Sequence, residues 1–368
     1  MKINQTPNSE RAEQARAIKG RGALKAKRIC LGIDAHLQWQ FVGRKVDHAG
    51  IQPTQRMSRA ELLLFGQKQL ELAEEVYAVY EAGPLGYGLC RELQALGIKA
   101  YVCAPESLES GTPGRKHNKL DGHKLAGRLA SYLEGDRHML RRVRVPSVFE
   151  EQLQAQSRQY DQLERTRKAM AAQGRSLLLK QGYAIRGKWW RPRAWSQLQQ
   201  ALMEGWILEL LEPWRASLKL LDSQIRELKK KLIASVAGPR PKGYGALTLV
   251  QVQREICDWQ RFSNGRRVAC FLGLCPGEKS SGFKQRLGRI LPGCNRRLRA
   301  KIIELVWRLV VFQPQYRPIQ KWVQALRSTN PIQKKKAAVA VARQVVIDWW
   351  RIQTGRVQPE QLGLAMIG

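Results

Sequence analysis

The spacing of hydrophobic positions near the start of the chain is typical of β-strands. Ile29, Leu31 and Ile33 alternate with other residues up to Asp34, and "WQFVGRKV" follows after a short turn. Because the side chains of a strand point to alternate faces, a period of two marks a strand that buries one face. Two such runs joined by a short turn predict an antiparallel β-hairpin.

The region after the hairpin predicts a helix and then a strand. Ser58 and Glu61 stand three residues apart at the start of "SRAELLLFGQKQLELA", which is the spacing of a capping box. The next run, "VYAVYEAG", is rich in β-branched and aromatic residues and ends at Glu81. We therefore expect a helix that begins at Ser58 and a strand that ends at Glu81.

A helix, a strand and another helix follow. Gly83 and Pro84 predict the start of a helix that Gly97 closes, and "IKAYVCAP" predicts a strand. Asp121 falls in the helix after that strand. Alternating strands and helices are typical of an α/β sheet, so we predict an α/β domain over residues 28–148.

From residue 149 the apolar period becomes helical. The first segment has apolar residues in a heptad pattern that polar residues interrupt. The second has apolar residues at regular spacings of four and three, which form one continuous seam along a helix. Two long helices are therefore expected to form a coiled-coil linker over residues 149–235. They pair either with each other or with a second subunit, and the pattern leaves both open. The two sets are Phe149, Leu153, Tyr160, Leu163 and Met170, then Trp214, Leu218, Leu221, Ile225, Leu228 and Leu232.

Residues 236–368 predict a mainly helical domain. In "KGYGALT", Gly243 and Gly245 flank one residue at the start of a helix, a spacing that lets backbone N–H groups approach a phosphate. A plain helix start with a tight turn fits the same residues. Two amphipathic segments, "WRLVVFQPQY" and "KKKAAVAVARQVVIDWW", follow, and their tryptophans are expected in the core.

The net charge of the chain bears on what kind of partner the protein binds. The 368 residues contain 64 Lys plus Arg against 30 Asp plus Glu, a formal net charge of +34. Positive charges in this excess repel one another, so we expect a polyanionic partner that neutralises them, and nucleic acid is the first candidate. Residues 1–27 are polar and rich in Lys and Arg, which predicts a flexible basic arm.

The sequence offers no sign of a membrane segment, a disulfide framework or a zinc site. It has no apolar run of about 18 residues and no signal-peptide layout, so we expect a soluble, cytoplasmic protein without a membrane partner. The seven cysteines are scattered without a C-x-x-C pair, and the five histidines show no metal-ligand spacing.

Three carboxylates are candidate metal ligands. Asp34 and Glu81 end predicted strands, at the edge where open α/β sheets bind ligands, and Asp121 lies on a later helix. Phosphodiester cleavage uses carboxylates that converge on divalent metals about 3.5 to 4 Å apart, and Mg²⁺ prefers such oxygen ligands. Acidic residues at strand ends also cap helices or lie in solvated loops. The spacing alone therefore leaves open whether these residues bind a metal or have only such a structural role.

A second candidate site is "FLGLCPGEKSSGFKQRLGRILPGCNRRLRAK", in which Ser280 and Ser281 precede a glycine. Serine is a weak nucleophile, but surrounding cations stabilise phosphorane charge and position a DNA phosphate. The alternative is a basic loop that only grips phosphate, and chemistry alone favours it. The candidate nucleic-acid-binding cations are Lys279, Lys284, Arg286, Arg289, Arg296, Arg297 and Arg299.

Several motifs together resemble one family. They are "GIDAH", "YEAGPLGYGLCREL", "NKLDGHKLAGRL", "GYGALTL", "DWQRFSNGRRVACFLGLCPGEKSSG" and "GCNRRLRAKIIELVW". In this order, from about residue 28 to nearly the end, they resemble insertion-sequence transposases that have an N-terminal Holliday-junction-resolvase-like domain, and the related pilin-gene DNA invertases.

The resemblance implies a fold class and a set of site residues. The fold is an α/β RNase-H-like (RuvC-like) N-terminal domain, a helical coiled-coil linker and a mainly α C-terminal domain. The family's acidic tetrad Asp, Glu, Asp, Asp carries over to Asp34, Glu81 and Asp121 at its first, second and last places, while its third place is Asn118. A nucleophilic serine carries over best to Ser281, with Ser280 second.

The resemblance also implies partners and a reaction. It implies Mg²⁺, double-stranded DNA at element ends and targets, a structured non-coding guide RNA, and dimers that assemble into tetramers. Strands would be cut and rejoined through a phosphoserine intermediate. Two alternatives stay open. One is a junction-resolvase-like metal nuclease. The other is a catalytically decayed nucleic-acid-binding protein, which is suggested by the departures from the family's pattern at Asn118 and in the loop from Pro292 to Cys294.

Overall fold

The chain forms two compact units with separate cores. The computed structural model describes residues 25–105, 118–201, 205–236, 238–278, 287–290 and 294–368. Contacts divide the chain into Met1–Val145 and Pro146–Gly368. Among the described residues, no helix is long and apolar enough to cross a membrane.

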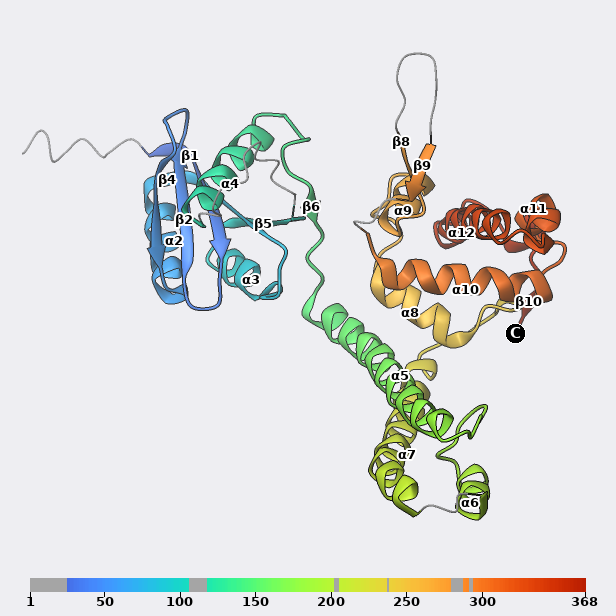
Figure 1. The fold of residues 1–368 in the computed structure, drawn as a ribbon. Coiled ribbons are helices and arrows are strands. Elements are labelled where there is room, and N and C mark those ends of the chain that lie inside the picture. Colours follow the sequence, from blue (N-terminus) through green and yellow to red (C-terminus); the bar gives the residue numbers. More distant parts are fainter. Residues whose placement is uncertain (1–24, 106–117, 202–204, 237, 279–286, 291–293) are drawn as a thin grey trace, which may run out of the picture. The chain divides into compact units, whose positions relative to one another are not determined.

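The first unit is built on a six-stranded mixed sheet with the order β3-β2-β1-β4-β5-β6 (Figure 1). Strands β1, β4 and β5 are parallel, whereas β2, β3 and β6 run antiparallel to their neighbours. The predicted β1–β2 hairpin is confirmed. The strands are Ala26–Ala35 (β1), Gln40–Val46 (β2), Gln52–Met57 (β3), Ala73–Glu81 (β4), Lys99–Cys103 (β5) and Arg142–Val143 (β6).

Helices cover both faces of this sheet. One face packs on α2 (Arg59–Leu72) and α3 (Gly88–Ala95), and Ile29 and Leu31 lie in that cluster. The other face packs on α4 (Asn118–Leu133), where Cys30 and Val79 meet Leu125 and its neighbours. The apolar alternation of β1 thus fills two cores, one on each side.

Two details of the first unit differ from the expectation. Helix α3 begins at Gly88 and not at Gly83 or Pro84. Gly86 has a φ of +65°, a left-handed backbone that a right-handed helix does not contain, and its carbonyl accepts a hydrogen bond from Tyr80 Oη at 3.0 Å. Strand β3 was missed because "QPTQRM" is polar and mostly exposed, as suits an edge strand.

Three glycines bring α4 unusually close to the hairpin. A Cβ added to Gly32 of β1 would lie 2.1 Å from the amide nitrogen of Ala126 and 2.3 Å from the carbonyl oxygen of Gly122. One added to Gly43 of β2 would lie 2.7 Å from the same oxygen. Only glycine permits this backbone-to-backbone approach, which fixes the first turn of α4 over β1 and β2.

We expect Gly32→Ala to destabilise the first unit by about 3 kcal/mol or more. The new methyl group would collide with backbone atoms of α4, which cannot rotate away as a side chain does. Gly50→Ala is the matched control, since a Cβ at Gly50 has no atom within 4 Å. Urea unfolding followed by circular dichroism measures both, and equal stability of the two variants would contradict the close contact.

The second unit is almost entirely helical (Figure 1). Its long helices α5 and α7 pack against each other within the chain, and Tyr160, Ile225 and Leu232 share one of their clusters. Phe149 was predicted to be part of the apolar seam, but it lies in the first turn of α5 and is 67% exposed, so it is not buried there. The helices are Val148–Lys180 (α5), Pro192–Ala201 (α6), Gly205–Ile233 (α7), Ala246–Ile256 (α8), Gly265–Phe271 (α9), Arg296–Phe312 (α10), Arg317–Arg327 (α11) and Pro331–Gln353 (α12).

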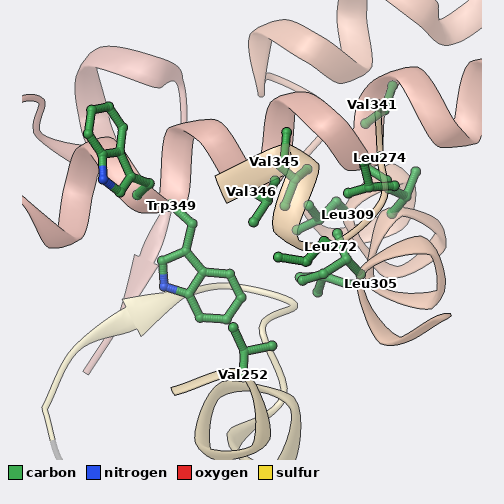
Figure 2. Close-up of a cluster of buried hydrophobic side chains, with 14 of the residues drawn as sticks. Val252, Leu272, Leu274, Leu305, Leu309, Val341, Val345, Val346 and Trp349 are labelled. Carbon is green, nitrogen blue, oxygen red and sulfur yellow. The ribbon is translucent and has the colours of Figure 1, made fainter. Parts of the chain in front are cut away.

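The C-terminal part of this unit has a large apolar core. Side chains from α8, α10, α12 and the segment after α9 converge in it, with Trp349 beside Val252 (Figure 2). Trp349 and Trp350 are buried as expected, whereas Trp307 is 37% exposed and does not follow the expectation. The short elements are Arg240–Pro241 (β7), Pro276–Glu278 (β8), Leu287–Ile290 (β9), Pro359–Leu362 (η1) and Met366–Ile367 (β10).

Candidate functional site

Two of the predicted carboxylates lie at the carboxyl ends of neighbouring parallel strands, Glu81 as the last residue of β4 and Asp34 just before the last residue of β1. Asp34 of β1 and Glu81 of β4 directly follow a pair of residues that are in register, so they lie side by side at the carboxyl edge of the sheet. Cys30 and Val79, at even spacings before them, belong to the cluster beneath α4. Because alternate residues of a strand share a face, both carboxylates lie on the α4 face.

The third carboxylate comes to this edge from α4. Asp121 lies in the first turn of the helix, directly before Gly122. A Cβ added to Gly122 would lie 2.5 Å from the carbonyl oxygen of Phe41, and Phe41 pairs with Asp34 across the hairpin. The close approach of α4 therefore brings Asp121 to the same end of β1.

The oxygen donors of this edge are of the kind that magnesium prefers. Carboxylates from two strands and one helix are hard ligands for a small divalent cation. Over the residues that the structure describes, no three His, Cys, Asp or Glu side chains gather closely enough to hold a metal ion. The carboxylates thus share a face and an edge of the sheet without forming a closed set of metal ligands in the described residues.

His36 is a member of this edge that the sequence reasoning missed. Its Nε2 lies 3.0 Å from Oδ2 of Asp34, and its ring meets that of Phe41 edge-on with centroids 5.8 Å apart. The contact orients the Asp34 carboxylate. The available signal was the spacing in "GIDAH", which places a second polar side chain two residues after the acid.

Glu81 also influences a buried thiol on the same face. Cys103 of β5 is its partner in the parallel register. Burial, and then the charge of Glu81, raises the pKa of Cys103 to about 11. The thiol therefore stays protonated at neutral pH, so Cys103 is not a competing nucleophile.

Part of the predicted C-terminal site lies outside the described residues. This holds for the serines Ser280 and Ser281 and for the cations Lys279, Lys284 and Arg286. Arg289 is in β9 and Asn118 begins α4, but their side chains are not described. Arg296, Arg297 and Arg299 occupy the first turn of α10, whose N-cap is Asn295.

Arg297 is held inside the unit. Its guanidinium donates to Asp161 of α5 and to Glu255 of α8, and Nη2 donates to the carbonyl oxygen of Ser157 at 2.7 Å. The Arg297 side chain is 20% exposed and that of Glu255 only 4%. Arg297 therefore ties α10 to α5 and α8, a role that its place in a basic run did not indicate.

The carboxylate of Asp161 is stabilised in its charged form. Burial raises its pKa, but hydrogen bonds from Lys301 and Arg297 outweigh burial and hold the pKa below its ordinary value. Lys301 Nζ donates to it at 2.9 Å. Because the pKa is lowered in the folded state, Asp161 contributes stability above the ordinary Asp pKa of about 3.9, and this contribution is lost as the pH falls through the lower, folded value.

We expect Arg297→Ala to lower the free energy of unfolding of the second unit by about 3 kcal/mol, because it removes a partner from the buried carboxylate of Glu255 and from the half-buried one of Asp161. For a unit of this size, that corresponds to a melting temperature about 6–12 °C lower. Differential scanning calorimetry measures the change, with the exposed neighbour Arg296→Ala as control. A variant that melts like the wild type but binds DNA more weakly would make Arg297 a DNA contact.

The remaining predicted contacts are partly used within the protein. Arg299 Nη1 donates to the carbonyl oxygen of Gly273 at 3.2 Å. Gly245 is the N-cap of α8, so the predicted helix start is confirmed. Gly243 has a φ of +88°, and its carbonyl accepts a hydrogen bond from Arg308 Nε at 2.9 Å. The tight turn needs Gly243 for its conformation.

The stretch that contains these glycines, the serines and α10 matches a known family model. Residues 240–320 match the model described as "Transposase IS116/IS110/IS902 family". This segment is similar to IS116/IS110/IS902 transposases. The match covers both Ser281 and the first turn of α10, and so the transposase segment (residues 240–320) includes the predicted nucleophile.

Relatives with transposase names extend the similarity beyond the transposase segment. The "Putative transposase y4qE" of Sinorhizobium fredii is 31% identical over 250 residues, which is 64% of this chain and 58% of that protein. The "Putative transposase y4rJ" of the same organism is 26% identical over 74% of this chain and 76% of its own length. The "Probable family 20 transposase" of Pseudomonas aeruginosa is 26% identical over 68% of this chain and 76% of its own length.

Proposed function

We propose that the chain is an insertion-sequence transposase that cuts and rejoins DNA strands. The observation that carries the proposal is the combination of a segment similar to transposases with two carboxylates at one edge of an α/β sheet and a third on the helix that packs over that sheet. A protein that only binds DNA has no need of such a carboxylate edge. The strand order, with a hairpin followed by parallel strands, supports a RuvC-like fold for the first unit.

In this proposal the carboxylates hold magnesium. Asp34, Glu81 and Asp121 would be its ligands, and Asn118 would stand at the position of a fourth acid. Bound magnesium would offset the charge that develops on the phosphate under attack. His36 keeps the Asp34 carboxylate oriented through its contact at 3.0 Å.

Ser281 supplies the nucleophile in the proposed reaction. Its Oγ forms a bond to the phosphorus, the bond from phosphorus to one deoxyribose oxygen breaks, and that oxygen takes up a proton. The serine gives up its proton in the same step. One phosphoester bond replaces another, so a strand is rejoined when a deoxyribose hydroxyl attacks the phosphoserine in the reverse direction.

The nucleic-acid partners follow from the same proposal. Double-stranded DNA at element ends and targets is the substrate, and a structured non-coding RNA pairs with both. The net charge of +34 supports a protein that neutralises many phosphates at once. Dimers that assemble into tetramers would hold two duplexes together during exchange.

The test is an adduct assay with the full chain. Labelled DNA matched to any RNA that co-purifies is incubated with Mg²⁺ and separated under denaturing conditions. Labelled DNA that migrates with the protein supports the proposal. Cleaved ends free of protein would instead show a metal nuclease, and tight binding without any cleavage would show a decayed copy.

A further inference from the structure

The turn between β1 and β2 exposes apolar side chains directly beside the carboxylate edge. Leu37 is 82% exposed and Trp39 is 40% exposed, and every residue from His36 to Trp39 is exposed. Two large apolar side chains in one exposed turn form an apolar surface that is available to a partner.

This turn is held in place on both sides. The amide of His36 donates to the carbonyl oxygen of Trp39 at 3.1 Å, which closes the turn. Gln40, which is buried, donates from Nε2 to the carbonyl oxygen of His36 at 2.6 Å. His36 in turn contacts Asp34. The backbone of the turn is therefore held in place next to Asp34.

A cation next to Trp39 indicates what kind of partner the turn binds. The guanidinium of Arg56, on β3, lies 4.2 Å from the centroid of the Trp39 ring. The guanidinium lies over one face of the indole, so the opposite face is the one on which a base would stack, and the arginine supplies a positive charge for the neighbouring phosphate. A protein partner bound to this turn would instead block access to the edge of the sheet at which Asp34 lies.

The distance to the carboxylates fits a nucleotide chain. Leu37 follows Asp34 by three residues, so their Cα atoms are at most about 11 Å apart. Successive phosphates of one strand are about 3.4 Å apart along a B-form duplex, so the turn reaches bases within about three nucleotides of a phosphate at the carboxylates.

We propose that the β1–β2 turn is a base-binding element that grips DNA next to the phosphate at the carboxylate edge. The indole of Trp39 stacks on an unpaired base, and Leu37 fills the space that this base leaves among the stacked bases of its own strand. Apolar wedges that unstack a base step are an established way to open DNA. The inference rests on the proposed function, since it takes a DNA phosphate to be held at Asp34.

The test compares two probes with the full chain in EDTA, which stops metal-dependent cleavage. One probe is a duplex with a gap of three nucleotides that carries 2-aminopurine in its unpaired strand, and the other is the same duplex without the gap. Wild-type protein is expected to quench the 2-aminopurine fluorescence, because the base stacks on Trp39. Fluorescence anisotropy gives the affinity for each probe.

Trp39→Ala is expected to abolish the quenching and to weaken binding of the gapped probe about 5- to 150-fold. Binding of the intact duplex should change less than about twofold, since phosphate contacts dominate it. Trp39→Phe keeps an aromatic platform and should retain the preference for the gap. Trp206→Ala is the matched control, because Trp206 is 43% exposed but lies on α7 in the other unit.

Leu37→Ala is expected to reduce the preference for the gapped probe, whereas Leu64→Ala, at a 59% exposed position on α2, should not. Unchanged quenching in Trp39→Ala would overturn the inference, as would an equal loss of affinity for both probes. A change of oligomeric mass with unaltered DNA binding would also overturn it, because the turn would then be a protein contact. Failure of the wild type to bind either probe would instead refute the proposed function.

Discussion

Asp34→Asn is expected to reduce the rate of DNA cleavage about 10³-fold or more, which is about 4 kcal/mol of transition-state stabilisation. The substitution keeps the size of the side chain but removes the negative charge at the centre of the carboxylate edge. Asp34 is next to Glu81 of the neighbouring strand β4 in the parallel register, and α4 packs closely on the hairpin that carries Asp34. Cleavage of labelled DNA at saturating Mg²⁺ gives the rate.

Binding should respond differently from cleavage in this variant. Removal of a negative charge near a phosphate does not weaken the complex, so anisotropy should give an affinity at least equal to that of the wild type. Glu74→Gln is the matched control, because Glu74 is an exposed acid near the start of β4, the neighbouring strand, at the opposite end from Glu81. Cleavage by Asp34→Asn at a tenth of the wild-type rate or faster would rule out Asp34 as a metal ligand.

Ser281→Ala is expected to abolish the covalent protein–DNA adduct. The variant lacks the Oγ that forms the bond to phosphorus, and a methyl group cannot replace it. Its binding to DNA should stay within about twofold of the wild type, since the surrounding lysines and arginines are unchanged. A denaturing gel with end-labelled DNA detects the adduct directly.

Ser280→Ala is the control for the serine assignment, since it changes the neighbouring residue in the same way. It should still form the adduct. The reverse result, an adduct with Ser281→Ala but none with Ser280→Ala, would move the nucleophile by one residue. An adduct with both single variants would exclude this serine pair.

Local signals predicted much of the first unit. The hairpin and the capping box at Ser58 depend on residues close in sequence, and both are as expected. Strand β3 was not predictable in this way. Its residues are polar and mostly exposed, so it is a strand because the exposed edge of β2 offers hydrogen bonds, and this leaves no apolar pattern.

The candidate site was predictable to a similar degree. That Asp34 and Glu81 lie at strand ends follows from two short apolar runs, and parallel pairing then places them at one edge. That Asp121 lies near them depends on the glycine contact between α4 and the hairpin, which joins segments about 80 residues apart in sequence. Sequence spacing carries no record of that contact.

The sequence by itself determined the order of the elements, the positive charge and the types of residue that chemistry needs, because these depend on neighbouring residues and on composition. Only the tertiary structure decided how those residues are used. Arg297 reads as one more cation in a basic run, yet its partners Asp161 and Glu255 are 136 and 42 residues away, and they hold it inside the unit. Trp39 was predicted to be part of a strand, yet it lies exposed in the turn between β1 and β2. Burial and exposure depend on which distant segments pack together, and for that reason they appear only when the chain is folded.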